Sequence, residues 1–514
     1  MEGVLVTAKK DGGTIAITVV SDDKGRYSFP STKLSPGSYT LKIRAVGYEI
    51  DGPKTAEVAA GKAATVDIKL KPTKNISAQL SNAEWLSSLP GTEDQHKFLY
   101  SCGGCHTVER ILKSSHDSDE FLNQVMVRMA SYASVAYPLS PQVRHVSRDM
   151  TRAFSPEAKS MANWLATVNL SDTEKWEYPL KGFARPTGRA THVVITEYDL
   201  PRKLMQPHDV VMDKGGNVWF SEFGEQNLGK MDPKTGKVSE FPLPLIREGF
   251  PTGNLDIEFD REGNLWLGLM MQTGVAKFDT KTEKFQLFKV PDSMLTEETQ
   301  QAMVAANNWE VDGKVWMNDV EKVALGRLDV KTGQMDPWYQ PYQLLKLPKG
   351  EAHSIYGVYT DSKNNVYFMD FSSQNIGRVD AKTLEMKLFP TPTPKSRPRR
   401  GRMDAQDRLW FAEWRADKVA MFDTKTNEFK EWSIPTPYSA PYDVVLDKND
   451  EIWTGGMTDD HIHRVDTKTG KTVDYLLPRE TNVRRVYVDN TTNPVTFWVG
   501  NNHGASIIKL EPQD

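Results

Sequence analysis

The two cysteines of this sequence lie three positions apart, and a histidine follows directly, in the run Cys102-Gly103-Gly104-Cys105-His106. Two thiols at this spacing can form thioether bonds to the vinyl groups of one haem, and the adjacent histidine can bind the iron. A thioredoxin-like redox pair would not need the histidine and would follow a strand, whereas the surrounding sequence has helical periodicity. The motif therefore predicts one covalently attached c-type haem, with His106 as the proximal iron ligand.

The distal ligand of the iron decides what such a haem can do. A methionine raises the reduction potential, a histidine gives a lower one, and an open position would admit oxygen or peroxide. The run from Cys102 to Pro141 resembles the haem domains of quinohaemoprotein amine dehydrogenases and related propeller-fused cytochromes. Met129 lies in an Arg-Met-x-x-Tyr stretch, and the resemblance implies that it is the distal ligand. The alternatives in the same segment are Met126, His145, Met150 and Met161.

The composition limits the partners and the compartment. The chain of 514 residues is 39% hydrophobic and 26% charged, with a formal net charge of −4, which argues against nucleic acid or an anionic membrane as the main partner. No apolar run approaches the about 20 residues that a transmembrane helix needs. Because the motif requires export, we expect a periplasmic or secreted protein whose signal peptide, absent from the first residues, has been removed.

Two smaller domains are predicted before the repeats. Residues 1–73 contain short β-rich runs separated by turns, and two of the strands expected here are Arg26–Phe29 and Ala64–Leu70. The string DDKGRYSFP…LSPGSYTLKIRAVGYE resembles the carboxypeptidase regulatory-like family. That resemblance implies a small β-sandwich with a structural or docking role. Residues 81–176 have helical periodicity, and Ser155 followed by Pro156 is typical of a helix start. We expect an all-α cytochrome c domain here.

Residues 191–514 contain a repeat. An Asp-x-Lys-Thr turn recurs six times, and an aromatic strand core such as Val218-Trp219-Phe220 precedes each turn. A seventh core, Phe497-Trp498-Val499, lacks a strand after its turn, and Ile195–Pro201 has the form of that missing strand. We therefore predict a seven-bladed β-propeller closed by its N-terminal strand, in a mainly β multidomain protein. The turns begin at Asp232, Asp279, Asp329, Asp380, Asp423 and Asp466.

Aligning the blades on their aromatic cores gives two polar columns that should meet at one mouth of the central channel. The acid column lies three residues after each core aromatic and reads Glu222, Leu269, Asp319, Asp370, Glu413, Gly456 and Asn501. The inner column begins the innermost strands and reads His208, Leu255, Tyr356, Arg399, Tyr442 and Arg484, with Asp209, Arg400, Asp443 and Arg485 beside it. His353 and His503 lie near these columns. Local salt bridges between loop residues are the alternative interpretation.

The repeat units PHDVVMDKGGNVWFSEFGEQNLGKMD and PYDVVLDKNDEIWTGGMTDDHIHRVD resemble the virginiamycin B lyase family. The resemblance implies the propeller fold and a metal-binding carboxylate with a histidine base at the propeller top. His208 or His353 could act as general base, and Glu222 and Glu413 could serve a metal ion. The four arginines of the inner column suit a carboxylate or another anion: Arg399, Arg400, Arg484 and Arg485. His461 and His463 point the same way on a strand, either as a metal site or, as we favour, as exposed strand histidines.

Three functions follow from these features. We favour a periplasmic oxidoreductase whose propeller binds a small anionic or phenolic organic substrate and whose haem passes electrons to a soluble cytochrome or another electron-transfer partner. The alternatives are a metal-dependent lyase with an accessory haem, and a non-enzymatic electron-transfer or binding protein. Since both cysteines belong to the haem motif, no Cys–Trp crosslinked quinone can form, and oxidation would fall to the haem or to an additional metal ion.

Overall fold

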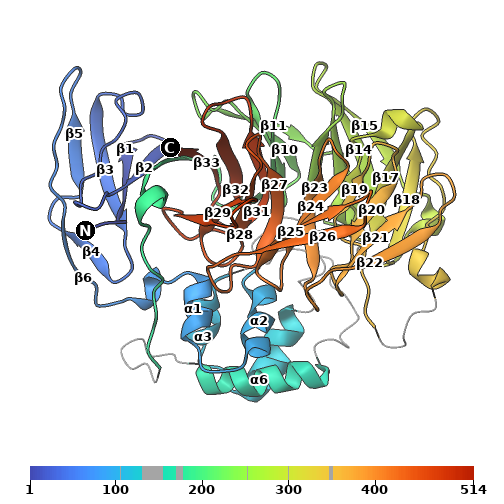
Figure 1. Ribbon diagram of the computed structural model, residues 1–514, viewed down its shortest axis with the longest axis horizontal. Coiled ribbons are helices and arrows are strands. Elements are labelled where there is room, and N and C mark those ends of the chain that lie inside the picture. The colour runs from blue at the N-terminus through green and yellow to red at the C-terminus, as the bar shows by residue number, and fades with distance from the viewer. Residues whose placement is uncertain are drawn as a thin grey trace.

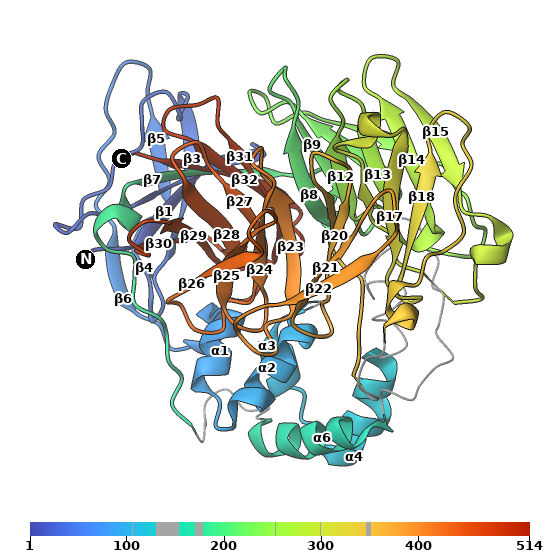
Figure 2. The same cartoon turned by 45° about the vertical axis from the view of Figure 1, so that its right-hand side comes forward.

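The computed structural model describes residues 1–104, 106–129, 154–169, 178–251, 253–298, 300–345 and 351–513. Figure 1 shows a large ring of β-sheets, a small β-domain beside it that contains the N-terminus, and a group of helices under one face of the ring. The helices remain under that face in the turned view of Figure 2. The protein is therefore mainly β, as predicted. Among the described residues, no helix is long and apolar enough to cross a membrane.

The small N-terminal domain is built from two sheets. Val6 and Ala8 on one strand and Leu41 on its neighbour are buried, and they pack against Ile68, just before the second sheet, and Leu70 within it. The predicted strand at 26–29 is not formed, and the one at 64–70 is a strand only from Lys69. The first sheet has the order β2 (Ile15–Val20), β1 (Leu5–Lys10), β3 (Gly37–Arg44) and β5 (Thr55–Val58), and the second pairs β4 (Tyr48–Asp51) with β6 (Lys69–Pro72).

Six sheets of the ring stand by themselves. Each has four antiparallel strands except the third, which has three. In chain order they are β8 (Pro207–Met212), β9 (Val218–Glu222), β10 (Asn227–Met231) and β11 (Val238–Pro242); β12 (Asp256–Phe259), β13 (Leu265–Leu269), β14 (Gly274–Asp279) and β15 (Lys284–Lys289); β16 (Val304–Ala305), β17 (Lys314–Asp319) and β18 (Ala324–Asp329); β19 (Val358–Thr360), β20 (Val366–Met369), β21 (Asn375–Val379) and β22 (Met386–Pro390); β23 (Pro398–Met403), β24 (Arg408–Glu413), β25 (Lys418–Asp423) and β26 (Glu428–Ser433); β27 (Pro441–Leu446), β28 (Glu451–Gly456), β29 (His461–Asp466) and β30 (Thr472–Leu476).

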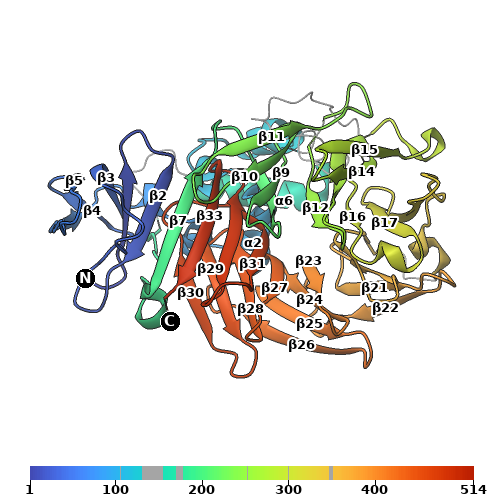
Figure 3. The same ribbon diagram turned by 90° about the horizontal axis from the view of Figure 1, so that it is seen from above.

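The remaining strands form one sheet with the N-terminal domain. β31 (Val483–Asp489), β32 (Thr496–Asn501) and β33 (Ser506–Pro512) are followed in the sheet by β7 (Val193–Asp199), so the predicted pairing of the N-terminal strand with the last repeat is confirmed. β7 then pairs through its other edge with β2, giving eight strands in all. Figure 3 shows β33, β7 and β2 in this order. The prediction of seven separate blades is thus corrected to six separate blades and one shared sheet.

The shared sheet fixes the N-terminal domain to the propeller. Ion pairs reinforce the backbone pairing, between Lys9 and Asp199 and between Lys33 and Glu511. Unpaired strand edges attract other chains, and the N-terminal domain covers the edge that β7 would otherwise expose. The docking role predicted for residues 1–73 therefore has a physical counterpart within this chain.

The repeated residues of the sequence make the same local contacts in most of the blades. The aspartate of the Asp-x-Lys-Thr turn accepts a hydrogen bond from the backbone two residues later, as Asp232 does from Lys234 at 2.8 Å. This Asx-type bond replaces a backbone bond and makes the turn tight. The core tryptophan donates from its indole to an aspartate six residues earlier, as Trp219 does to Asp213 at 2.9 Å. The repeat in the sequence is thus a repeat of turn chemistry.

The helical segment begins with well-capped helices. Ser81 and Thr92 each form a capping box, and the predicted cap by Ser155 is confirmed. The apolar core of the helical segment contains Trp85 and Leu99, and it continues into propeller residues such as Tyr442. The assignment of this segment as a cytochrome c domain stays a prediction. The helices are α1 (Asn82–Ser88), α2 (Glu93–Cys102), α3 (Val108–Leu112), α4 (Ser118–Glu120), the π-helix η2 (Phe121–Met126) and α6 (Pro156–Val168).

Candidate functional site

Three residues of the inner column meet at the centre of the propeller mouth. The hydroxyl groups of Tyr356 and Tyr442 lie 2.9 Å apart, and Tyr442 Oη lies 3.1 Å from His208 Nε2. The other nitrogen of His208, Nδ1, lies 2.6 Å from Asp209 Oδ1. Burial lowers the pKa of His208 to about 4, so the imidazole is neutral near neutral pH. Since Asp209 can only accept, Nδ1 carries the proton and Nε2 accepts from Tyr442.

Arg399 lies beside this chain of hydrogen bonds and faces four aromatic rings. Its guanidinium carbon is 4.4 Å from the ring centre of Tyr442, 5.4 Å from Tyr356, 4.7 Å from Phe371 and 5.1 Å from Trp414. Such contacts favour a cation over the face of a ring. The predicted convergence of the inner column is therefore confirmed for His208, Tyr356, Arg399 and Tyr442.

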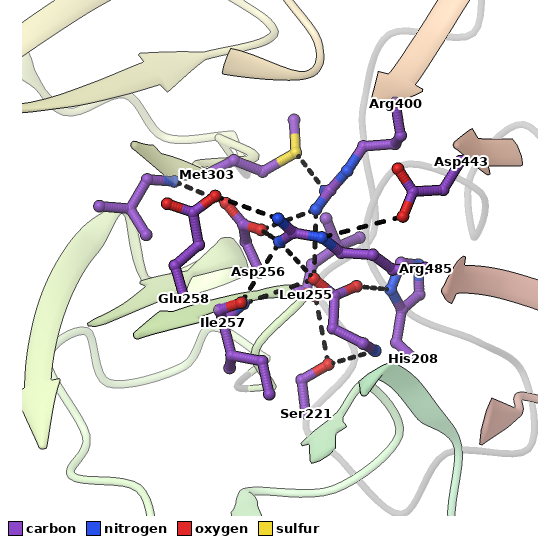
Figure 4. A network of polar contacts seen from close by, with 12 residues as sticks. His208, Ser221, Leu255, Asp256, Ile257, Glu258, Met303, Arg400, Asp443 and Arg485 are labelled. Atoms are coloured by element: carbon purple, nitrogen blue, oxygen red, sulfur yellow. Dashed lines mark hydrogen bonds and ion pairs between the residues drawn. The ribbon is translucent and has the colours of Figure 1, made fainter. Parts of the chain in front are cut away.

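A buried ion network fills the channel behind His208 (Figure 4). Arg400 donates to Asp209 at 3.2 Å and to Asp256 at 2.7 Å, and Arg485 donates to the same two carboxylates and to Glu258 at 3.0 Å. Although burial alone would raise the pKa of Asp209, the two guanidinium groups hold it well below its usual value. Arg400 and Arg485 were expected to face an anionic substrate. The geometry instead engages both with carboxylates of the protein.

The acid column has a local role in several blades. Glu222 accepts from the backbone N–H of Gln206, Asp370 from that of Ser354 at 2.9 Å, and Asn501 from that of Asn482 at 3.3 Å. Each donor lies two residues before the inner-column residue of the same blade. The recurring acid thus satisfies the loop that enters the innermost strand, and this need explains the column without catalysis.

Two of these acids are protonated near neutral pH. Burial raises the pKa of Glu222 and of Glu413 to about 8 in each case. Within the described part of the chain, neither acid is hydrogen-bonded to His208 or to the two tyrosines. A metal site shared by Glu222, Glu413 and His208 is therefore not assembled here. Among the described residues, no three His, Cys, Asp or Glu side chains are grouped so as to hold a metal ion. The additional metal ion stays a prediction.

His353 lies in the fourth blade and makes contacts there. Its Nδ1 lies 2.7 Å from Asp370 Oδ2, and its ring stacks on Tyr342 with centroids 4.3 Å apart. Tyr342 also donates to Asp370, at 2.7 Å. The described contacts therefore tie His353 to the acid of its own blade and do not join it to His208. The role of His353 as general base stays a prediction, because its described contacts do not link it to the His208–Tyr442–Tyr356 chain.

The two histidines of β29 are buried, so the prediction of exposed strand histidines is wrong. His463 lies between Asp459 and Asp474, at 2.9 Å and 2.8 Å, and His461 Nδ1 lies 2.7 Å from the carbonyl oxygen of Asp459. Gly456 makes this arrangement possible, because a Cβ there would lie 1.9 Å from Asp459 Oδ1. The glycine of the acid column thus makes room for an acid from the next loop.

The Cys-x-x-Cys-His segment lies directly on this mouth. The carbonyl oxygen of Gly104 accepts from Arg484 Nη2 at 2.8 Å, and that of Gly103 accepts from Asn482 Nδ2 at 3.3 Å. His503 is buried close by, and its pKa falls to about 3 because of burial and because Arg484 is near. On the fifth blade, Tyr100 of α2 donates to Asp417, in the loop between β24 and β25, at 3.0 Å. The segment is thus hydrogen-bonded to the strands that form the mouth.

The side chains of the motif itself are placed as follows. Cys102 is half-buried and packs against the apolar core of the helical segment, and Cys105 lies outside the described residues. His106 Nδ1 lies 3.1 Å from the carbonyl oxygen of Thr107. Met129 is half-buried at the end of the helical run that follows η2, whereas His145 and Met150 lie outside the described residues. Met126 and Met161 contact the apolar core.

Three residues that contact the motif segment or Arg399 were missed in the sequence. Phe371, Trp414 and Met457 each come one position after the acid column. Trp414 packs on Tyr100 with ring centroids 5.2 Å apart, and its indole N–H donates to the sulfur of Met457 at 3.2 Å. A run of large apolar residues directly after a polar column was the available signal. Large apolar residues at these positions indicate side chains that cover the propeller mouth.

Comparisons with known proteins agree with this architecture. Residues 342–513 match the virginiamycin B lyase family, and residues 1–71 match the carboxypeptidase regulatory-like domain. Among solved structures, a streptogramin B lyase is 20% identical and has a TM-score of 0.52, with 63% of this chain and 99% of that chain covered. Virginiamycin B lyase from Staphylococcus aureus is 19% identical and has a TM-score of 0.51, with 62% and 99% covered. None of the curated proteins matches the chain. The propeller is therefore virginiamycin B lyase-like in fold.

Proposed function

We propose that the chain is a c-type haem redox protein of the periplasm or of the extracellular space, in which the propeller mouth binds a small organic electron donor. The observation that carries the proposal is the contact between the motif and the mouth. Gly103 and Gly104 are hydrogen-bonded to Asn482 and Arg484 at the start of the innermost strand β31. A haem bonded to the motif would supply one-electron transfer at that position.

The residues of the motif fit a c-type haem. An iron-bound histidine usually donates its other ring N–H to a backbone carbonyl or a carboxylate, and His106 Nδ1 faces the carbonyl oxygen of Thr107. That contact leaves Nε2 for the iron. Cys102 lies against an apolar core, and Met129 is half-buried in the same segment. We propose His106 and Met129 as the two iron ligands and Cys102 and Cys105 as the attachment points.

Haem attachment can be tested on the full chain, exported in a host with cytochrome c maturation. We expect one haem per chain that stays bound after acid–acetone extraction and gives a pyridine haemochrome spectrum of the c type. Replacing Cys102 and Cys105 together by serine abolishes this, whereas His116→Gln, a histidine of the same segment outside the motif, does not. Extraction of all haem from the wild-type chain would refute the proposal.

The distal ligand has its own test. A methionine-ligated ferric haem shows a weak far-red absorption band, which we expect in the wild-type protein and in Met126→Leu but not in Met129→Leu. Absence of the band in the wild type would favour another ligand.

A second candidate is a lyase that uses the same mouth, and the fold match favours it. The solved structures include a catalytically inactive Staphylococcus aureus virginiamycin B lyase with quinupristin. The central His208–Tyr442–Tyr356 chain could then move a proton. Anaerobic mixing separates the two functions. Small phenols and aromatic carboxylates that reduce the haem under argon support the redox proposal, whereas loss of intact quinupristin at a rate independent of the haem oxidation state supports the lyase.

A further inference from the structure

Four arginines of the mouth were expected to attract an anion, and only one of them remains available for it. Arg400 and Arg485 are paired with buried carboxylates. Arg484 donates to the carbonyl oxygen of Gly104 and, at 2.5 Å, to Asn482. Around Arg399, by contrast, the described residues place no carboxylate within ion-pair distance. Among the described residues it differs from Arg400 and Arg485 in having no carboxylate partner, and from Arg484 in having no oxygen acceptor for its guanidinium.

The surroundings of Arg399 make this lack costly. The one hydrogen bond that the described residues give its guanidinium runs from Nη1 to the sulfur of Met457 at 3.4 Å, and sulfur is a weak acceptor. Among the described residues, Nε of Arg399 is buried without a hydrogen-bond partner. Arg399 is half-buried, and the four aromatic rings around its guanidinium keep part of the surrounding water away from it. A desolvated cation of this kind is stabilised when an anion completes its coordination.

The place of Arg399 indicates which anion can reach it. Met457, its sulfur partner, also lies next to the haem motif, since a Cβ on Gly104 would lie 4.0 Å from Met457 Cε. Trp414, one of the four rings, packs on Tyr100 at the end of α2. Arg399 therefore lies at the seam between the motif and the propeller mouth. A second cation, Arg397, lies 5.6 Å from the ring of Phe371 at the same seam.

We propose that Arg399, supported by Arg397, binds a carboxylate at this seam. A guanidinium forms paired hydrogen bonds with a carboxylate, and the aromatic walls suit a flat apolar body attached to it. Two sources offer this chemistry. One is a propionate of the haem, and this source rests on the proposed function. The other is a free aromatic carboxylate, which does not require the haem.

The test compares Arg399→Gln and Arg399→Lys with a matched control, Arg327→Gln. Arg327 is also stacked on an aromatic ring, Trp316 at 5.3 Å, but it is paired with Asp336 and lies on the third blade. Each full-length protein is examined by a redox titration of its haem and by a calorimetric titration with benzoate. The lysine variant keeps the charge and shows whether a change comes from charge or from misfolding.

If the carboxylate is a haem propionate, loss of the positive charge favours ferric haem. Arg399→Gln then shifts the reduction equilibrium about tenfold toward the ferric form, or about 59 mV for a one-electron couple. Arg399→Lys recovers most of this shift, and benzoate binds to none of the proteins. If the site takes a free carboxylate, benzoate binds to the wild type and about tenfold more weakly to Arg399→Gln. The haem reduction potentials of the wild type and Arg399→Gln are then equal.

Two results have distinct meanings. If neither the potential nor benzoate binding changes in Arg399→Gln beyond the Arg327→Gln control, the carboxylate site is refuted. If the wild-type chain carries no covalent haem, the proposed function fails, and benzoate titration of the haem-free protein alone decides the site.

Discussion

His463 should make the stability of the propeller depend on pH in the alkaline range. Its ring is fully buried between the carboxylates of Asp459 and Asp474. Burial by itself would lower the pKa of the imidazole, but the two carboxylates outweigh burial and raise it to about 10. In the unfolded chain a histidine titrates near 6.5. Because the folded pKa is the higher one, the stabilisation is complete below about pH 6.5 and is lost as the pH rises toward 10.

The magnitude follows from the difference between the two pKa values. The folded and unfolded pKa values of His463 differ by about 3.5, and a difference of one corresponds to about 1.4 kcal/mol. The free energy of unfolding should therefore fall by roughly 5 kcal/mol between about pH 6.5 and 10. We would measure the free energy of unfolding by guanidinium titration with tryptophan fluorescence, in steps across this range. His463→Gln cannot become charged, so it should lack this loss. At neutral pH the same variant should cost about 3–5 kcal/mol, because it leaves the buried carboxylate of Asp459 and the half-buried carboxylate of Asp474 without this cation.

The control is His461→Gln, on the same strand. Among the described residues, the imidazole of His461 contacts a backbone carbonyl and no carboxylate, so this variant should keep the alkaline loss of the wild type. A wild-type unfolding free energy that stays level from pH 7 to 10 would refute the reasoning. An equal slope in the wild type and in His463→Gln would do the same, because the loss would then come from other groups.

Other substitutions test the same principles elsewhere. Gly456→Ala places a Cβ on the carboxylate of Asp459 and should lower the free energy of unfolding by several kcal/mol, about as His463→Gln does; an unchanged value would contradict the packing. Arg400→Met removes one cation from the buried network and should cost about 3–5 kcal/mol in the same titration, part of which Asp209→Asn restores. Glu222→Gln imitates the protonated acid. The wild type loses stability as the pH rises from about 4.5 toward the raised pKa of about 8, and this variant should lose less over that interval.

The inner column was predictable because it depends on local spacing. In five blades the inner-column residue lies 11 residues before the core aromatic, as His208 does before Trp219, and the side-chain period of a strand is two. Residues such as His208 and Tyr442 therefore occupy equivalent places in their blades, although they lie far apart in the sequence. Their convergence required only that the blades form a ring. The closing strand was predictable for the same reason, since one repeat lacked a strand and one strand lacked a repeat.

The buried pairings were not predictable in this way. Arg485 and Asp256 belong to different blades, and nothing in their local sequence shows that their side chains meet across the channel. The same arginine type in the same column can face a substrate, a carbonyl group or a carboxylate of the protein. The acid column was misleading for a related reason, since an acceptor needed by the loop in several blades gives the same pattern as a set of converging catalytic acids.

The union of the N-terminal domain with the propeller also lies beyond the sequence pattern. β2 and β7 each read as an ordinary strand, and the backbone groups that join them have no sequence signature. Likewise, the join between the helical segment and the mouth uses the carbonyl oxygens of Gly103 and Gly104, which any residue would offer. Only the large side chains after the acid column, Trp414 and Met457 among them, indicated a covered mouth.

The covered mouth bears directly on the choice between the two candidate functions. In this chain the motif loop is hydrogen-bonded to Asn482 and Arg484 at the start of β31, and α2 is hydrogen-bonded to Asp417 in the loop between β24 and β25. A substrate that approached the His208–Tyr442 pair from this face would have to pass the helical segment or displace it. A bulky cyclic peptide would require displacement, whereas a small carboxylate would need only the space around Arg399. The same contacts bring the haem motif against the aromatic side chains of the mouth. A redox function thus uses the helical segment where it lies, and a lyase function requires that it leave.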